Sequence, residues 1–348
     1  MKHTNMHGIK SKSVIDALVH DDYDLTERPE NVFSATQIID APKPKVLFYR
    51  HREEIIVDVS DNFHMLDGSA VHYAVERSNK NAEAARLSEE RIFIEVNGLE
   101  ELWHVHTLKI GEKIVTAPWY SPQKLYVSCK FDNYEYDDQI VEDYKRCSVW
   151  ETIYGLKESR VQQLNIAALG LDMLGFPVVG CRACLFLKDW TNGDLRSFEA
   201  KGDLKYPKVA YKEYQFTRWD EKKTREYIFE RVHLHFFAQQ VDDDEIPPCT
   251  QEERWYRGES YAVMKDGVKT AKRVFKVEPG TTTAEEAEKF ANSHAEELQS
   301  VAKKGEHFYV EKRPGQDIRC NGDKVYCPSR TFCHYWRQKY GNVDNSEY

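Results

Sequence analysis

The alternation of apolar and polar positions is clearest in residues 124–145, KLYVSCKFDNYEYDDQIVEDYK. From Leu125 to Phe131 every second side chain is apolar, and a similar alternation returns from Gln139 to Lys145 after an acidic segment. A period of two residues is that of a β-strand. We therefore expect two neighbouring strands joined by a tight acidic turn.

The two expected strands bring charged side chains together. Asp143 and Lys145 are two residues apart, so they point to the same face of a strand, and Tyr144 points to the opposite face. Asp132 lies at the end of the preceding strand. Two carboxylates beside an ammonium group suit a hard divalent cation and an activated water molecule.

Helical periodicity precedes and follows these strands. Residues 66–78 are predicted as a helix with an apolar stripe, on which His72 and Glu76 share one face. A lone histidine on a helix is usually structural, so this segment alone leaves the role of His72 open. Residues 157–177 are predicted as a second helix, with Gln163 in its first half.

The remaining patterns alternate between strands and helices. We expect a helix from Ser34 or Thr36 that Pro42 ends, a charged helix over 81–91, strands at 91–98 and 113–119, a buried strand at 178–187 and an amphipathic helix at 224–237. This order of elements predicts an α/β fold.

Composition supports a folded chain with an acidic overall charge. The 348 residues are 41% hydrophobic and 12% aromatic, and the formal net charge is −9. An acidic net charge gives no general electrostatic attraction for nucleic acid, but it is compatible with a local basic groove. Basic and aromatic residues interleave over 201–237, and four cations there are candidate DNA contacts: Lys205, Lys208, Lys212 and Arg218.

No stretch approaches 18 consecutive apolar residues, so we expect no transmembrane helix and no contact with a membrane. The N-terminal residues show no secretory signal. We therefore expect a cytoplasmic protein, in the host cytoplasm if the source is viral. The eight cysteines are then expected to be reduced thiols or metal ligands.

The sequence divides near residue 246, after an acidic, proline-containing segment. We expect a lead-in over 1–31, a main domain over 32–246 and a cysteine-bearing region over 247–348. Four cysteines of that region suit an iron–sulfur cluster or zinc: Cys249, Cys320, Cys327 and Cys333.

Within that region, residues 255–312 (hereafter the insert) are predicted as a β-β-α-β subdomain. Asp266-Gly267 marks a hairpin turn, and Thr283 with Glu286 forms a capping box. We assign no chemistry to the insert. Elsewhere, we interpret Cys181 and Cys184 as core residues, and His104 and His106 as an ordinary strand surface in preference to a zinc site.

The D-x(10)-D-Y-K pattern at 132–145 resembles the PD-(D/E)XK nucleases, in particular the RecB-like branch that includes phage and CRISPR-associated exonucleases. The order of motifs carries the resemblance: His72, Asp132, Asp143, Lys145, Gln163, then the cysteines. It implies a restriction-endonuclease-like core, a central mixed sheet flanked by helices, followed by the insert and a cysteine metal site.

The resemblance also implies roles for single residues. Mg²⁺ or Mn²⁺ would be held by His72, Asp132, Asp143 and the backbone carbonyl of Tyr144. Lys145 would position or deprotonate the attacking water. Gln163 would belong to the catalytic set, with Gln162 as the alternative if the register differs by one residue.

Two features depart from the family pattern. The glutamine motif of the branch is Q-x-x-x-Y, but position 167 is alanine. The fourth cluster cysteine often precedes the nuclease motifs, whereas here Cys249 follows them. The resemblance implies a 4Fe–4S cluster at the C-terminal cysteines, and zinc remains the alternative.

The resulting expectation is a divalent-metal-dependent DNA exonuclease that processes phage or mobile-element DNA, with a recombination or single-strand-binding protein as a partner. The alternative is an inactive DNA- or protein-binding accessory of the same fold. A zinc hydrolase is disfavoured because no H-E-x-x-H motif occurs, and nucleotide-driven activity is disfavoured because no G-x-x-x-x-G-K-[ST] loop occurs.

Overall fold

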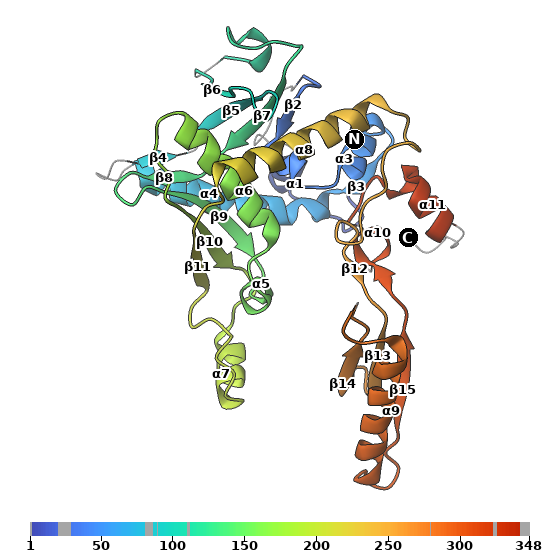
Figure 1. The fold of residues 1–348 in the computed structure, drawn as a ribbon. Helices are drawn as coiled ribbons and strands as arrows, with labels where there is room; N and C mark the ends of the chain where they lie inside the picture. Colours follow the sequence, from blue (N-terminus) through green and yellow to red (C-terminus); the bar gives the residue numbers. More distant parts are fainter. Residues whose placement is uncertain are drawn as a thin grey trace. The chain divides into compact units, whose positions relative to one another are not determined.

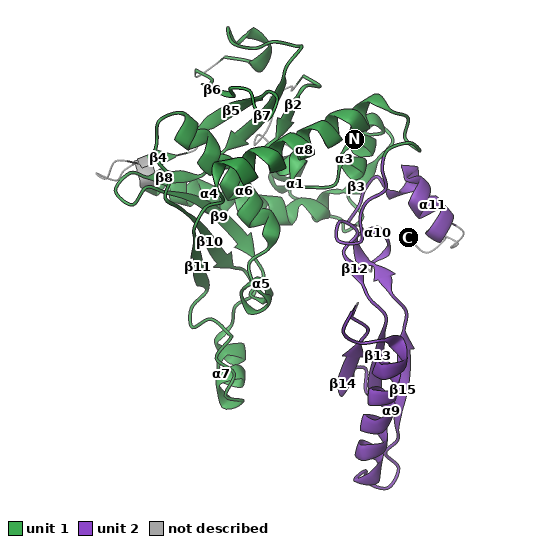
Figure 2. Ribbon diagram, viewed as in Figure 1, with its two compact units in different colours: residues 1–246 green, residues 247–348 purple. Residues whose placement is uncertain are grey.

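The computed structural model describes residues 2–19, 29–80, 86–88, 90–109, 112–278, 280–322 and 326–341. The chain divides into two compact units, residues 1–246 and 247–348 (Figure 2). Several sheets with helices around them make this a mixed α/β protein, as the order of the elements predicts.

The larger sheet of the first unit has five strands in the order β11-β10-β9-β8-β4 (Figure 1). Its members are β4 (Arg86–Ser88), β8 (Asn133–Glu135), β9 (Ile140–Cys147), β10 (Gly180–Leu187) and β11 (Tyr211–Phe216). Strands β9 and β10 are parallel, and the other pairs are antiparallel.

A second sheet of four strands has the order β2-β7-β5-β6. Its members are β2 (Val32–Ser34), β5 (Arg91–Val96), β6 (His104–Thr107) and β7 (Leu125–Lys130). A separate parallel pair joins β1 (Lys2–Thr4) to β3 (Ile56–Asp58).

The two strands expected to be neighbours belong to different sheets. β7 pairs with β5 and β2, whereas β9 pairs with β10 and with the short strand β8. Phe131 and Asp132 form the passage between the sheets, and the tight turn into β9 contains Gln139 at φ 54°. Alternation runs on through Phe131 and Asp132, so the two-residue period cannot reveal that the partner strand changes.

The helices of the first unit are α1 (Lys12–Val19), α2 (Ala35–Ile38), α3 (Pro42–Arg50), α4 (Phe63–Lys80), α5 (Trp150–Tyr154), α6 (Glu158–Met173), α7 (Asn192–Ala200) and α8 (Glu221–Gln240), with 3-10 turns at Val59–Asn62 and Ile114–Thr116. The predicted helices at 66–78, 157–177 and 224–237 are confirmed by α4, α6 and α8. Among the described residues, no helix is both long and apolar enough to cross a bilayer.

Three local predictions are wrong or fall outside the described residues. Pro42 begins α3 and does not end a helix, because its fixed φ and missing N–H suit the first helical position. The expected strand at 113–119 contains a 3-10 turn. In the expected helix at 81–91, residues 86–88 form strand β4, and 81–85 and 89 lie outside the described part.

Helix α6 packs into the main apolar core of the first unit. Its residues Leu164, Ala168 and Leu171 share this core with Cys181 and Ala183 of β10. At Gly170 an added Cβ would lie 2.2 Å from Ile92 Cδ1 of β5, so a larger residue there would displace the buried Ile92 side chain. The core therefore holds α6 firmly beside β9, where the charged residues lie.

The second unit contains the insert. Its elements are β12 (Tyr256–Arg257), β13 (Ser260–Lys265), β14 (Arg273–Lys276), α9 (Ala284–Ser300), β15 (Phe308–Arg313), β16 (Gln316–Asp317), α10 (Ile318–Asn321), a 3-10 turn at Arg330–Phe332 and α11 (His334–Tyr340). The predicted β13–β14 hairpin and the Thr283–Glu286 capping box are both confirmed. Strands β12 and β16 precede and follow the three-stranded sheet and α9 in the sequence, and their antiparallel pairing brings these two parts of the chain together.

Candidate active site

Strand β9 and helix α6 bring three of the predicted catalytic side chains together. Asp143 is 3% exposed, and its Oδ1 forms an ion pair with the Lys145 ammonium group. Gln163 of α6 donates a hydrogen bond from Nε2 to the same oxygen at 3.0 Å. This contact supports the register that places Gln163, rather than Gln162, in the site.

Asp132 joins this group from the passage between the two sheets. It is 3% exposed, and its Oδ2 accepts a hydrogen bond from the backbone N–H of Tyr144 at 2.6 Å. His72 of α4 lies with its Nδ1 3.5 Å from Asp132 Oδ1. Four segments that are distant in the sequence therefore meet at this point.

The buried charges influence one another strongly. Burial raises the pKa of Asp132 to about 6, and the neighbouring Asp143 adds to this rise, while Lys145 and His72 oppose it. Burial alone would lower the pKa of Lys145, but Asp143 and Asp132 outweigh it, so this pKa lies above its usual value. Lys145 is therefore an ammonium group at neutral pH.

The side chains of Asp132, Asp143 and His72 are chemically suited to bind a divalent cation, but as placed they do not form a complete metal site. Among the described residues, no group of three or more His, Cys, Asp or Glu is arranged to hold a metal ion. However, Asp143 Oδ2 is buried and has no hydrogen-bond partner in the described part of the chain. A buried carboxylate oxygen left in this way is destabilising unless a cation or water contacts it. With Asp132 beside it, the site offers the hard oxygen donors that Mg²⁺ and Mn²⁺ prefer.

A second polar network, which the sequence did not reveal, lies on the other face of β9. Glu142 is 6% exposed and accepts hydrogen bonds from Arg182 Nη1 at 2.6 Å, Asn133 Nδ2 at 2.8 Å and the Tyr144 hydroxyl at 3.0 Å. These contacts link β8, β9 and β10. In the sequence, the one indication of this network is Glu142, which stands next to Asp143. Its partner Arg182 lies 40 residues away, so no local pattern connects the two residues.

The four candidate DNA contacts differ in their surroundings. Lys205 and Lys208 are exposed between α7 and β11. Lys212 is exposed on β11, in register with Leu185 of β10, which is itself in register with Lys145. Lys212 therefore shares the face of Lys145, about 10 Å away. Arg218 is engaged within the protein, because its Nη2 lies 2.9 Å from Asp172 Oδ2.

All eight cysteines are free thiols. Cys181 and Cys184 are buried on opposite sides of β10, which confirms their interpretation as core residues. At the C-terminal cysteines, burial raises the pKa of Cys320 to about 12, and the thiols of Cys327 and Cys333 contribute to this rise.

Cys249 belongs to the same neighbourhood. Burial raises the pKa of its thiol, and Cys327 and Cys333 add to the shift. Cys249 and Cys320 are thus each within electrostatic range of Cys327 and Cys333, but among the described residues the four do not form a group arranged for a metal ion. The cysteine metal site expected from the sequence is therefore not detected.

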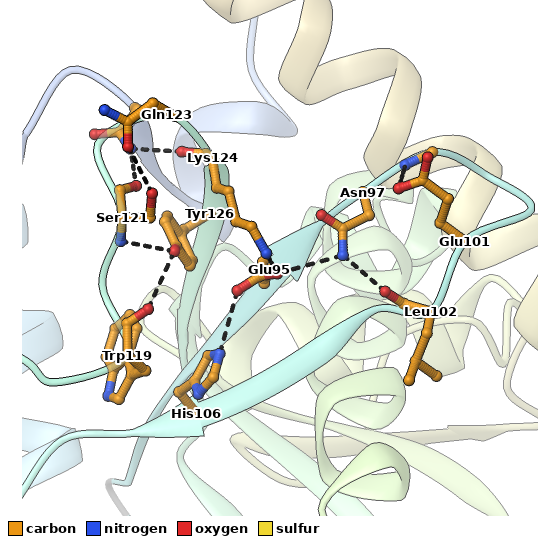
Figure 3. Close-up of polar contacts among 12 residues, drawn as sticks. Glu95, Asn97, Glu101, Leu102, His106, Trp119, Ser121, Gln123, Lys124 and Tyr126 are labelled. Carbon is orange, nitrogen blue, oxygen red and sulfur yellow. Dashed lines mark hydrogen bonds and ion pairs between the residues drawn. The ribbon is translucent and has the colours of Figure 1, made fainter.

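A separate buried carboxylate lies in the second sheet (Figure 3). Glu95 of β5 is 4% exposed, forms an ion pair with Lys124 and lies 3.5 Å from His106 Nε2. Burial raises the pKa of Glu95, but the contacts with Lys124, Asn97 and His106 together outweigh it, so the pKa is below its usual value. The His106 ring stacks on Trp119 with centroids 4.6 Å apart. This cluster provides a lysine–carboxylate pair outside the group formed by Asp132, Asp143, Lys145 and Gln163.

No family model and no curated protein matches the sequence. Among solved structures, the crystal structure of SSO0001 is similar to this chain with a TM-score of 0.41 and 13% sequence identity. The similarity covers 66% of this chain and 88% of that chain. At this score and identity it carries no argument about the fold or the activity.

Proposed function

We propose that this protein is a divalent-metal-dependent DNA nuclease of the PD-(D/E)XK type, with a restriction-endonuclease-like core, and that it acts as an exonuclease. The observation that carries the proposal is the cluster around Asp143: Lys145 and Gln163 both contact its Oδ1, and Asp132 accepts the N–H of the adjacent Tyr144. The other oxygen of Asp143, Oδ2, is buried and has no hydrogen-bond partner among the described residues. Two of these segments, β9 and α6, are held together by the main core.

In this proposal Asp132, Asp143 and His72, with the backbone carbonyl of Tyr144, would hold Mg²⁺ or Mn²⁺. A bound divalent cation would supply charge stabilisation for the reacting phosphate. Gln163 fixes the orientation of Asp143 through its hydrogen bond. Lys145 acts as a cation that orients the attacking water and stabilises developing negative charge, because its raised pKa makes it a poor general base.

The Lys145→Ala variant tests the assignment. Loss of a charge contact made in the transition state costs about 3 kcal/mol or more, so we expect cleavage of a labelled duplex or single strand in Mg²⁺ or Mn²⁺ to slow by at least about a hundredfold. Lys124→Ala is the matched control, because it also removes the lysine from a buried carboxylate, Glu95, but in the other sheet.

Equal cleavage rates for Lys145→Ala and the wild-type protein would contradict the proposal. If the wild-type protein binds DNA but does not cut it with either metal ion, the inactive accessory of the same fold replaces the nuclease. The thermal unfolding of both variants shows whether any lost activity reflects the site or the fold.

We also propose that Cys249, Cys320, Cys327 and Cys333 bind a 4Fe–4S cluster, with zinc as the alternative. Support comes from the presence of all four cysteines in the second unit and from the short spacing of the last three in the sequence. Because the thiols as placed do not form a metal-holding group among the described residues, binding requires these side chains to rearrange. We expect anaerobically purified protein to contain iron and to absorb broadly near about 400 nm, as such clusters do. Stoichiometric zinc would favour the alternative, and neither metal would contradict the proposal.

A further inference from the structure

Charge is segregated within the insert. The β13–β14 hairpin, residues 260–276, contains five basic side chains and one acidic side chain, whereas α9 contains five acidic side chains and one basic side chain. The basic side chains of the hairpin are Lys265, Lys269, Lys272, Arg273 and Lys276. The chain as a whole has a net charge of −9, so the positive charge of the hairpin is local. A local basic patch is the electrostatic footprint of polyanion binding.

The three-stranded sheet of the insert, in the order β14-β13-β15, has two different faces. Helix α9 covers one face, where its buried alanines pack with Tyr261 and Val263. Strand alternation places the following side chains on the opposite face, which we call the open face: Ser260, Ala262, Met264, Val274, Lys276, Tyr309, Glu311 and Arg313. Val274, Lys276 and Tyr309 are exposed there.

Some cations of the insert are engaged and others are available. Lys265 pairs with Glu306 at 2.7 Å, and Arg313 pairs with Glu311 at 2.6 Å. In contrast, Lys269, Lys272 and Lys276 are exposed, and none of them forms an ion pair with any residue that the structure describes. β14 is an edge strand of the sheet, so these ammonium groups follow one side of the hairpin.

We propose that the β13–β14 hairpin and the open face bind double-stranded DNA, mainly through its phosphates. Proteins can bind DNA through the strands of a β-sheet, and lysines along an edge strand can reach the phosphates of a duplex. In the insert β14 is the edge strand of the three-stranded sheet, and the available cations lie on this strand and the loop before it, where a duplex can reach them.

The open face suits a duplex better than a single strand. Single-strand binders stack successive bases on several aromatic rings. Among the described residues, Tyr309 is the one aromatic side chain of the open face, and its ring is already stacked on His307, with centroids 6.2 Å apart and planes at 14°. The inference rests on the proposed function for DNA as the ligand and adds a DNA contact outside the catalytic group.

The test compares two triple variants that remove equal charge from the same unit. The hairpin variant, Lys269→Gln/Lys272→Gln/Lys276→Gln, removes three of the five positive charges of the hairpin. The control, Lys289→Gln/Lys303→Gln/Lys304→Gln, neutralises exposed lysines on α9 and in the loop that follows it. Binding of a short labelled B-form duplex is measured by fluorescence anisotropy in EDTA at several salt concentrations, so that no cleavage occurs.

We expect the hairpin variant to bind the duplex at least about tenfold more weakly, with a salt dependence shallower by about 2.7 in log–log slope for three lost phosphate contacts. The control variant should bind within about twofold of the wild-type protein. Wild-type affinity in the hairpin variant, or an equal loss in both variants, would overturn the inference. So would a hairpin-dependent preference for single-stranded DNA or duplex RNA over duplex DNA.

The two proposals fail in different ways. A protein that cuts no DNA in Mg²⁺ or Mn²⁺ but loses duplex affinity in the hairpin variant refutes the nuclease and supports the hairpin contact. A protein that cuts DNA, and whose hairpin variant keeps wild-type duplex affinity, supports the nuclease and refutes the hairpin contact.

Discussion

Asp132 is a buried carboxyl group whose surroundings change its pKa. In the folded protein burial raises its pKa to about 6, whereas an unfolded aspartate titrates near about 3.9. The folded state therefore binds this proton more tightly than the unfolded state does. It follows that this group lowers the stability of the metal-free protein as pH rises from about 4 to about 6, and the full penalty remains at neutral pH.

We predict that Asp132→Asn stabilises the metal-free protein at neutral pH. The amide keeps an oxygen for the Tyr144 N–H and removes the buried charge, so the free energy of unfolding should rise by about 1–3 kcal/mol. Urea unfolding in EDTA measures this change. Added Mg²⁺ should stabilise the wild-type protein and have little effect on the variant, because the variant lacks one of the carboxylates proposed to bind the ion.

Asp143→Asn is the control for that prediction. Asp143 forms the direct ion pair with Lys145, so this variant leaves a buried ammonium group without its closest partner and should lower the free energy of unfolding. If Asp132→Asn also destabilised the metal-free protein, the pKa of Asp132 could not be raised in the folded state as described.

At the scale of elements, periodicity predicted the positions of β9, α4, α6 and α8 because each has a continuous pattern of its own. It could not predict where the chain leaves one sheet for another. The alternation predicts that residues 125–131 and 139–145 form neighbouring strands, yet β7 and β9 lie in different sheets. Alternation describes one strand at a time and contains no information on its partner.

Partners distant in the sequence explain the other differences. The site residues His72, Asp132, Asp143 and Gln163 were predicted from the order of motifs, and the structure brings them together. The network of Glu142 with Arg182 has no such motif. It depends on the register between β9 and β10, which only the folded sheet establishes.

At the scale of the whole molecule, the two units are stabilised in different ways. The first unit has a large apolar core that extends from the sheets to α6 and α8. The second unit has a small core in which buried alanines of α9 pack against β13. Small cores supply little stability and need additional links. Asp317 supplies such a link outside the insert core.

Asp317 is fully buried and accepts hydrogen bonds from Arg254 Nε at 3.0 Å, Tyr335 at 2.7 Å, Lys339 at 2.8 Å and Tyr340 at 2.8 Å. Burial raises the pKa of this carboxyl, but the hydrogen bonds, led by that from Lys339, outweigh it and hold the pKa well below its usual range. Its contribution to stability is therefore present above about pH 4, the unfolded pKa, and is lost as pH falls below that value.

We predict that Asp317→Asn destabilises the second unit alone. Removal of one partner from a buried charge network costs about 3–5 kcal/mol, so amide hydrogen exchange in α10, α11 and β12 should accelerate by at least about a hundredfold, while exchange in β9 and α6 stays unchanged. Tyr340→Phe, the matched control, removes a single hydrogen bond and should cost about 1 kcal/mol. Equal acceleration in both units would show that they unfold as one, and no acceleration in either would show that Asp317 does not support the second unit.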